Sequence, residues 1–303
     1  MTIATDSPVS GPSLEAATPS SVSAPSNAPT IVIQPSRGWA SLHLRAVWEY
    51  RELLYFLVWR DVKVRYKQTV LGIAWIVLQP IVSMIVFSAL FGGLLKVPSG
   101  DVPYPIFAFT ALLPWNYFAG SLTRSSQSLV NSSHLITKVY FPRLIIPMSA
   151  VLSGLVDFGV SFVILIGLMV YYRIALTPAA LLLPLFLLLA MATALGFGLW
   201  LSALNARYRD IGYLVPFLVQ MWMYVTPVVY GASLIPERYR WILALNPMTA
   251  VVEGFRWSLL GSEMAITEAT PWVFVASLLM LVVTLMSGLI FFRRTERTFA
   301  DVI

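Results

Sequence analysis

The chain has 303 residues, of which 58% are hydrophobic and 11% are charged, and its formal net charge is +6. Soluble globular domains are roughly 45–50% apolar and about 25% charged, so this composition excludes an ordinary soluble fold and indicates a membrane protein. The absence of cysteine excludes disulfide bridges and thiolate metal sites.

The first segment, residues 1–36, is rich in Ser, Pro, Ala and Thr and contains no Lys or Arg. It lacks the basic region and the apolar region of a signal peptide. We therefore expect a disordered tail there.

Residues 37–67 form the second segment, an expected cytoplasmic interface helix. Between Val47 and Tyr66 apolar residues recur at helical spacing, and basic residues fall on the opposite face. A helix with this pattern lies in the membrane interface instead of crossing the bilayer. Two interpretations stay open, an anchor that only fixes orientation and a surface that acts on a substrate or a partner.

Residues 68–303 contain six long stretches that are almost free of charge, and a helix needs about 20 apolar residues to cross the hydrocarbon core. We therefore expect an all-α membrane domain with six transmembrane helices, at about 71–95, 105–129, 144–172, 178–204, 212–232 and 271–292.

The stretch between the fifth and sixth expected spans has a pattern of its own. Residues 241–252 are uncharged but too few to cross the bilayer, and Asn246-Pro247 interrupts them. We expect a pair of short re-entrant helices in the outer leaflet, and the alternative is a loop that lies on the surface.

The distribution of basic residues sets the expected orientation. Fifteen of the 20 Lys and Arg residues fall on one side of the spans, and the positive-inside rule makes that side cytoplasmic. Both termini are then cytoplasmic, and the basic excess is a topology signal that makes a nucleic-acid ligand unnecessary. The acids on the outer side are scattered among basic residues, a pattern typical of solvated charges.

The chain lacks the motifs of most enzymes. It has no G-x-x-x-x-G-K-[ST] loop, no H-E-x-x-H motif and only two histidines, so it does not bind ATP through a Walker loop. We find no internal repeat, which argues against secondary transporters built from inverted repeats.

Asp157 is the only acid inside an expected span, where a charge is costly. One interpretation is a proton relay or a polar contact in a substrate path. Because we find no second intramembrane acid or base, we favour a helix-packing role, with Ser153, Ser161 or a neighbouring helix as the partner.

Aromatic residues cluster in PWNYF at 114–118 and in MWMYVTPVVY at 221–230. A Trp or Tyr ring offers a flat face to a sugar ring and a polar tip to its hydroxyl groups. Trp115, Tyr117, Trp222 and Tyr224 are therefore candidates for a glycan path. The alternative is the interfacial aromatic belt, which explains Trp222 and Tyr224 less easily because they lie several residues inside their span.

Two short cytoplasmic elements separate the spans. NSSHLITKVYFPR at 131–143 begins with helix-capping residues and has a stop at Pro142, which predicts a short helix. This element and the turn NARYRD at 205–210 suit either contact with a soluble partner or simple loop closure.

The stretch WRDVKVRYKQTVLGIAWIVLQP at 59–80 resembles the signature region of the permease subunits of bacterial type 2 ABC exporters for surface polysaccharides, including O-antigen, capsule and teichoic acid. The closing ERTFADVI at 296–303 is similar to the C-terminal tail of the capsule and O-antigen members. The resemblance covers about residue 40 to the end of the chain.

The resemblance implies a homodimeric permease in the bacterial inner membrane that moves a lipid-linked polysaccharide outward. Two copies of a separate nucleotide-binding subunit would bind ATP and Mg and hydrolyse the ATP, so this chain would hold no cofactor and would not be an enzyme. The glycan channel would lie between the two protomers and be formed largely by spans one and five.

The resemblance also implies three groups of site residues. The cytoplasmic entrance would contain Trp59, Arg60, Asp61, Lys63, Arg65, Tyr66 and Lys67. The channel wall would include Trp75, Trp222, Tyr224 and Tyr230, beside the aromatic candidates named above. The helix at 131–143 would dock on the ATPase subunit through His134, Lys138, Tyr140 and Arg143.

Basic residues at an entrance also have an independent chemical reason, because Arg and Lys hold phosphate in a partly desolvated interface and a lipid-pyrophosphate-linked glycan carries phosphate. Two alternatives remain. One is a type 2 ABC exporter of drugs or lipids, and the other is a stand-alone membrane enzyme that acts on polyprenyl-linked sugars.

Overall fold

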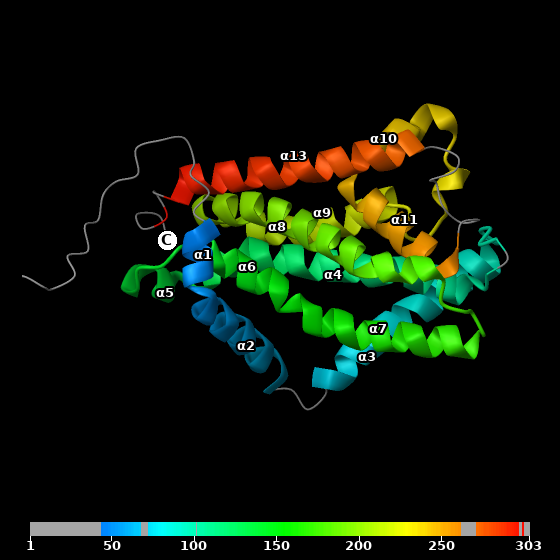
Figure 1. Cartoon of the computed structure of the whole chain (residues 1–303), viewed down its shortest axis with the longest axis horizontal. Helices are drawn as coiled ribbons and strands as arrows, with labels where there is room; N and C mark the ends of the chain where they lie inside the picture. The colour runs from blue at the N-terminus through cyan, green and yellow to red at the C-terminus, as the bar shows by residue number, and fades with distance from the viewer. Residues whose placement is uncertain (1–43, 68–71, 101, 262–270, 297–298, 300–303) are drawn as a thin grey trace, which may run out of the picture. The chain divides into compact units, whose positions relative to one another are not determined.

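The structure is a computed structural model that describes residues 44–67, 72–100, 102–261, 271–296 and 299, all within one compact unit that runs from Ala40 to Ile303. The regular secondary structure of these residues is entirely helical (Figure 1). The tail expected at 1–36 lies outside the described residues.

The expected interface helix forms as two pieces, α1 (Leu44–Glu49) and α2 (Arg51–Lys67), and α2 packs against α6 (Ile145–Leu152). Leu57 of α2 is buried, whereas Tyr55, Phe56 and Trp59 are exposed. The apolar face of α2 is therefore divided between contact with the bundle and an exposed aromatic surface, and aromatic side chains of this kind suit a membrane–water interface.

Within the described part of the chain, four segments are long and apolar enough to cross a membrane, which makes this a multi-pass membrane protein. The first lies in α3 (Gly72–Phe87) and the π-helix η1 (Ser88–Leu94). The other three are α6 with α7 (Gly154–Tyr171), η2 (Pro178–Leu182) with α8 (Leu183–Arg207), and α13 (Pro271–Thr295). All four coincide with expected spans.

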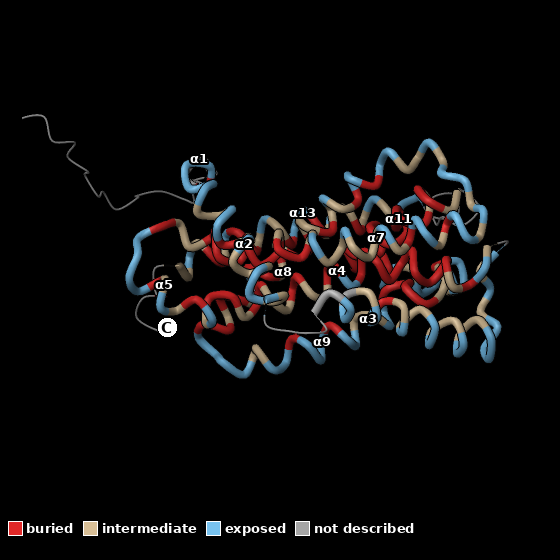
Figure 2. Tube along the Cα trace, turned by 90° about the horizontal axis from the view of Figure 1, so that it is seen from below, coloured by how far each residue is buried: buried red, intermediate tan, exposed pale blue. Residues whose placement is uncertain are grey.

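The two other expected spans correspond to α4 (Tyr104–Asn131) and α9 (Ile211–Val225). Helix α4 is central, since it contacts α3, α6, α7, α8, α9 and α11. Its buried residues include Ser121, Ser125, Ser126 and Ser128. Small polar residues let helices approach closely inside a bundle and also lower the hydropathy of α4. Buried residues accordingly gather along α4 and α8 (Figure 2).

Helices α8 and α13 pack at a close crossing of Gly196 and Gly288. A Cβ atom added at Gly288 would overlap the backbone oxygen of Gly196, so this approach requires a residue without a side chain. Close contact between small residues replaces hydrophobic attraction as the source of helix association in a bilayer.

Helix α9 ends at Val225, before the end of the fifth expected span at residue 232. Thr226 has an extended backbone with φ −84° and ψ 140°, because a residue before proline is disfavoured in helical conformation and Pro227 follows. The uncharged run continues past this point, but the helix does not.

Between α9 and α13 the chain forms η3 (Ala232–Leu234), η4 (Glu237–Tyr239), α10 (Arg240–Ala244) and α11 (Pro247–Leu260). The break between α10 and α11 is at the predicted Asn246-Pro247. The Asn246 side chain caps α11 by accepting a hydrogen bond of 3.0 Å from the backbone N–H of Met248, and Pro247 takes the first helical position. Helix α11 is buried against α4, α8 and α13.

Candidate functional site

The candidate site is centred on the Asp157 carboxylate, near the start of α7. Arg65 of α2 places Nη1 2.6 Å from Asp157 Oδ2, and the hydroxyl group of Tyr66 donates a hydrogen bond to Oδ1. Arg124 of α4 places Nη1 3.5 Å from the same Oδ2. We call Arg65, Tyr66, Arg124 and Asp157 the Asp157 cluster. It joins three helices at the point where α2 ends, just before α3.

Local sequence explains how Arg124 reaches this position. A Cβ atom at Gly154 would overlap Arg124 Nη2 and lie 2.6 Å from Ser121 Oγ, so the glycine provides the space that the guanidinium group occupies. Arg124 Nη2 also donates to Ser121 Oγ at 3.3 Å. The junction between α6 and α7 is therefore shaped around this arginine.

Helix α2 is held to the bundle by polar contacts on successive turns. Ser149 Oγ of α6 lies 3.5 Å from Asp61 Oδ2, and Asp61 also pairs with Arg60 at 2.8 Å. One turn later Arg65 Nη2 donates to Ser153 Oγ at 3.3 Å. The end of α2 is thus positioned by charged and hydroxyl groups more than by apolar packing.

The Asp157 cluster contains two guanidinium groups and one carboxylate, so it carries a surplus of one positive charge. The charged side chains are partly buried, with 28% of Arg65 and 29% each of Arg124 and Asp157 exposed. Burial and the hydrogen bond to Asp157 raise the pKa of Tyr66 above its usual value of 10. The phenol therefore keeps its proton at neutral pH and acts as a donor.

The structure corrects one part of the interpretation of Asp157. A partner on a neighbouring helix is confirmed, and Arg124 of α4 is a second charged group beside Asp157 that the sequence interpretation did not include. The sequence carried the signal, because Arg124 falls within the second expected span at about 105–129.

The expected entrance residues divide into two groups. Arg65 and Tyr66 face Asp157, while Trp59, Lys63 and Lys67 are exposed on α2. Arg60 is partly buried and paired with Asp61. The exposed group leaves two cations and an indole ring available to a ligand or to the membrane surface.

Two expected channel residues are core residues in this structure. Trp115 is 2% exposed and Tyr117 is 4% exposed. The Tyr117 hydroxyl donates to the backbone oxygen of Val151 at 3.1 Å, and Trp115 packs against Phe118 and Trp222. Both rings are covered within the protomer, because α4 is central in the bundle and its neighbours pack over them.

The other aromatic candidates are less buried. Trp75 of α3 is 59% exposed and Tyr224 of α9 is 48% exposed. Trp222 is half-buried against Trp115, Phe118 and Phe197, and the hydroxyl of Tyr230 donates to the backbone oxygens of Tyr224 and Val225. Trp75 and Tyr224 therefore offer the most free ring surface.

Arg256 and Glu253 of α11 correct the expectation of solvated outer charges, because both are buried and paired at 3.1 Å. Arg256 Nη1 donates to the backbone oxygens of Pro227 at 2.6 Å and Tyr230 at 3.1 Å, and Nη2 donates to that of Val228. The guanidinium group also lies over the Phe107 ring. It thus supplies donors to the non-helical segment after α9, whose backbone must be satisfied inside the protein.

Comparison with known proteins decides the class of the chain. Residues 52–260 match the family described as ABC-2 type transporter. This range runs from the second residue of α2 to the end of α11 and includes the whole Asp157 cluster. The chain belongs to the ABC-2 type transporter family.

Three relatives of this ABC-2 transporter are named as polysaccharide export or transport proteins. It is 30% identical over 256 residues, 84% of this chain and 96% of the relative, to the O-antigen export system permease protein RfbA of Myxococcus xanthus. It is 29% identical over 257 residues to a protein of the same name from Klebsiella pneumoniae, covering 83% and 95% of the two chains. It is 22% identical over 238 residues to the polysialic acid transport protein KpsM of Escherichia coli, covering 78% and 91%.

The short helix predicted within 131–143 of the ABC-2 transporter forms as α5 (Ser133–Lys138). His134, Lys138 and Tyr140 are exposed, and Tyr140 is 87% exposed. Arg143 instead binds within the chain, because its backbone N–H donates to Glu296 Oε1 at 3.2 Å and its guanidinium group donates to the backbone oxygen of Glu296. Three of the four residues are thus free to contact another protein.

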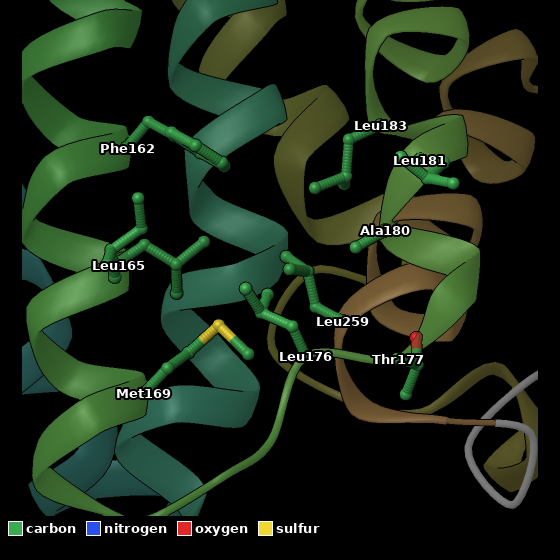
Figure 3. Close-up of a pocket in the computed structure, with 10 residues that line it drawn as sticks. Phe162, Leu165, Met169, Leu176, Thr177, Ala180, Leu181, Leu183 and Leu259 are labelled. Carbon is green, nitrogen blue, oxygen red and sulfur yellow. The ribbon is translucent and has the colours of Figure 1, made fainter.

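A pocket of about 360 Å³ lies between α7, η2 and α11 of the ABC-2 transporter (Figure 3). Its lining is apolar, with Phe162, Leu165 and Met169 on one wall and Leu183 and Leu259 opposite. The one hydroxyl group in the lining, on Thr177, donates to the backbone oxygen of Ser258. This pocket therefore offers no donor to a phosphate or a sugar.

Proposed function

We propose that the protein is the channel-forming permease subunit of an ATP-driven exporter that moves a lipid-linked polysaccharide, of O-antigen or capsule type, across the bacterial inner membrane. The observation that carries the proposal is the 30% identity to the Myxococcus xanthus O-antigen permease over 96% of that protein. The likeness extends over nearly the whole relative, so it is not confined to one segment.

In this proposal α4 and α9 complete six transmembrane spans, with both termini in the cytoplasm. The 28 residues of α4 extend about 42 Å, which is enough to cross a hydrocarbon core of about 30 Å. The 15 residues of α9 extend only about 22 Å, and the segment held by Arg256 continues the crossing. Helices α10 and α11 are the re-entrant pair of the outer leaflet.

The cytoplasmic entrance is formed by α2, which lies in the membrane interface. Its exposed Tyr55, Phe56 and Trp59 sit at the headgroup level, and Lys63 and Lys67 receive the anionic lipid end of the substrate. The exposure of these five side chains in the protomer supports this assignment.

Two copies of the permease form the channel along the exposed faces of α3 and α9. On α3 the exposed face includes Trp75 and Val82, and on α9 it includes Tyr213, Phe217 and Tyr224. Large exposed apolar faces need a covering, and aromatic rings among them suit a passing sugar chain. Trp75 and Tyr224 are the channel residues that the proposal retains.

Energy enters through two copies of a nucleotide-binding subunit, which hold ATP and Mg. Helix α5 contacts this subunit through His134, Lys138 and Tyr140, and Arg143 fixes the loop to the C-terminal segment. The exposure of the first three side chains supports this role.

Deletion of the gene in its host tests the proposal. We expect loss of polysaccharide from the cell surface, accumulation of the lipid-linked glycan inside, and recovery with the wild-type gene. The proposal would be wrong if surface polysaccharide were unchanged, or if the purified permease alone turned over a polyprenyl-linked sugar without an ATPase subunit.

A further inference from the structure

In the Asp157 cluster, two hydrogen-bond donors and a third group, the Arg124 guanidinium at 3.5 Å, converge on one small anion from different helices. Arg65 and Tyr66 come from the last turn of α2, and Arg124 comes from α4, 58 residues or more away in sequence. Arg65 and Arg124 reach the same oxygen, while Tyr66 reaches the other. The donors thus surround a planar oxyanion that the chain itself supplies.

The charge of the cluster is not balanced by that oxyanion. Two guanidinium groups face one carboxylate, whereas a phosphate group carries up to two negative charges and offers more acceptor oxygens. Guanidinium groups bind phosphate through paired, charge-assisted hydrogen bonds, and a phenol adds a neutral donor. The donor set therefore matches a phosphate better than it matches Asp157.

We propose that Arg65, Tyr66 and Arg124 form a phosphate-binding site and that Asp157 is an internal competitor that occupies this site in the resting protein. The inference rests on the proposed function, because the phosphate is that of the lipid end of the exported glycan. It adds Arg124 as a binding residue and gives Asp157 a role in controlling access.

Binding and helix position are linked in this site. With Asp157 in place, Arg65 and Tyr66 tie the end of α2 to α7. A phosphate that takes over the arginines releases α2 from α7, while the contact of Asp61 with Ser149 still holds α2 to α6. The end of α2, directly before the first span, is then free to move as the substrate enters.

The experiment uses the full-length permease in phosphatidylcholine nanodiscs. Since the chain has no cysteine, Val64→Cys carries a single fluorophore on an exposed position of α2 and reports binding. One arm titrates inorganic pyrophosphate, and the other places a polyprenyl pyrophosphate in the nanodisc. A fluorescence change with inorganic pyrophosphate shows that the phosphate groups alone are sufficient for binding. A change only with the polyprenyl pyrophosphate shows that binding also needs the lipid.

We expect Asp157→Asn to bind the pyrophosphate about tenfold tighter, because one charge-assisted contact no longer competes. Arg124→Gln is expected to bind about tenfold weaker, for the loss of one such contact. Glu237→Gln, a carboxylate 88% exposed in a pair with Arg240, is the matched acid control, and Arg207→Gln is the matched cation control. Both controls should bind as the wild type does.

Equal or weaker binding by Asp157→Asn overturns the competitor role, and unchanged binding by Arg124→Gln overturns the site. If Asp157→Asn does not fold, the Tyr66→Phe variant tests the site instead. It removes one hydrogen-bond donor, so it must weaken pyrophosphate binding, and unchanged binding overturns the site. A second label at Val163→Cys on α7 measures movement: the distance to Val64→Cys should increase with pyrophosphate in the wild type and be long already in Asp157→Asn.

The two levels of the proposal fail in different ways. If the wild-type gene restores export but these variants do not change pyrophosphate binding, the phosphate site is wrong and the proposed function still holds. If the variants show the expected binding pattern but the wild-type gene does not restore export, the phosphate site holds and the proposed function is wrong.

Discussion

Arg65 Nη1 lies 2.6 Å from Oδ2 of Asp157, a residue 92 positions later in the chain. This ion pair is the direct electrostatic link between α2 and α7. It fixes the end of a helix that carries exposed aromatic residues to a segment long and apolar enough to cross a membrane.

The first prediction concerns the strength of this pair. A double-mutant cycle with Arg65→Gln and Asp157→Asn should give a coupling energy of about 0.5–1 kcal/mol, because the partly exposed pair is weakened by solvent. The measurement is chemical unfolding of the detergent-solubilised protein. The same cycle on the pair of Arg240 and Glu237, whose carboxylate is 88% exposed, should give less, and a larger coupling there would contradict the assignment.

The second prediction tests the space beside Arg124. Gly154→Ala should lower the free energy of unfolding by about 1–3 kcal/mol, because the new methyl group overlaps the Arg124 guanidinium group. Gly159→Ala is the matched control on the same helix, since no atom lies within 4 Å of its added Cβ. Unfolding of the two variants at the same denaturant concentration would show that Gly154 has no such role.

The third prediction concerns the buried Arg256. Arg256→Met should destabilise the protein by about 3–5 kcal/mol, because it removes the cation paired with Glu253 and the donor to the carbonyl groups of Pro227, Val228 and Tyr230. Arg256→Lys should recover only part of the stability that Arg256→Met loses, since one ammonium group cannot reach all the separate carbonyl groups. Thermal unfolding in nanodiscs measures both, and the exposed Arg238→Met should melt as the wild type does.

The fourth prediction separates core aromatic residues from channel residues. Trp115→Ala should cost about 3–5 kcal/mol of stability, because it empties a buried site against Phe118 and Trp222. Tyr224→Ala should leave stability within about 0.5 kcal/mol, as is usual for surface positions, and should slow export. Thermal unfolding and surface polysaccharide measured together distinguish them. Normal export by a stable Tyr224→Ala variant would remove it from the channel wall.

The fifth prediction concerns contact with the ATPase subunit. Lys138→Glu and Tyr140→Ala change exposed side chains of α5 and the residues after it, so neither should alter thermal stability. Both should lower export and weaken co-purification of the permease with the ATPase subunit. Lys96→Glu, an exposed cation on the proposed outer side, is the control that should leave both measurements unchanged.

Long apolar runs predicted the positions of four membrane-crossing segments and of the break at Asn246-Pro247, because these features depend on local sequence. The end of α9 was missed although its signal, Thr226-Pro227, is also local, since the uncharged run hides it. Apolar composition gives the length of a run and not the length of the helix within it.

The parts of the site that the sequence did not predict depend on tertiary contacts. Arg256 has the same charge as a solvated arginine, and only the packing of α11 shows that it is buried. Likewise, the spacing of residues in the sequence does not predict that Arg65 and Arg124 contact the same carboxylate. Residue type identified Asp157 as unusual, but its partners come from helices distant in sequence.

The contacts of Arg256 have a consequence for the order of biosynthesis. The arginine is 26–29 residues later in the chain than the carbonyl groups of Tyr230, Val228 and Pro227 that it binds. When α9 leaves the ribosome, these acceptors still lack their donor. The C-terminal end of α9 is therefore completed only after α11 has been translated and has entered the bundle, so a chain truncated before residue 256 retains carbonyl groups after α9 that lack this donor.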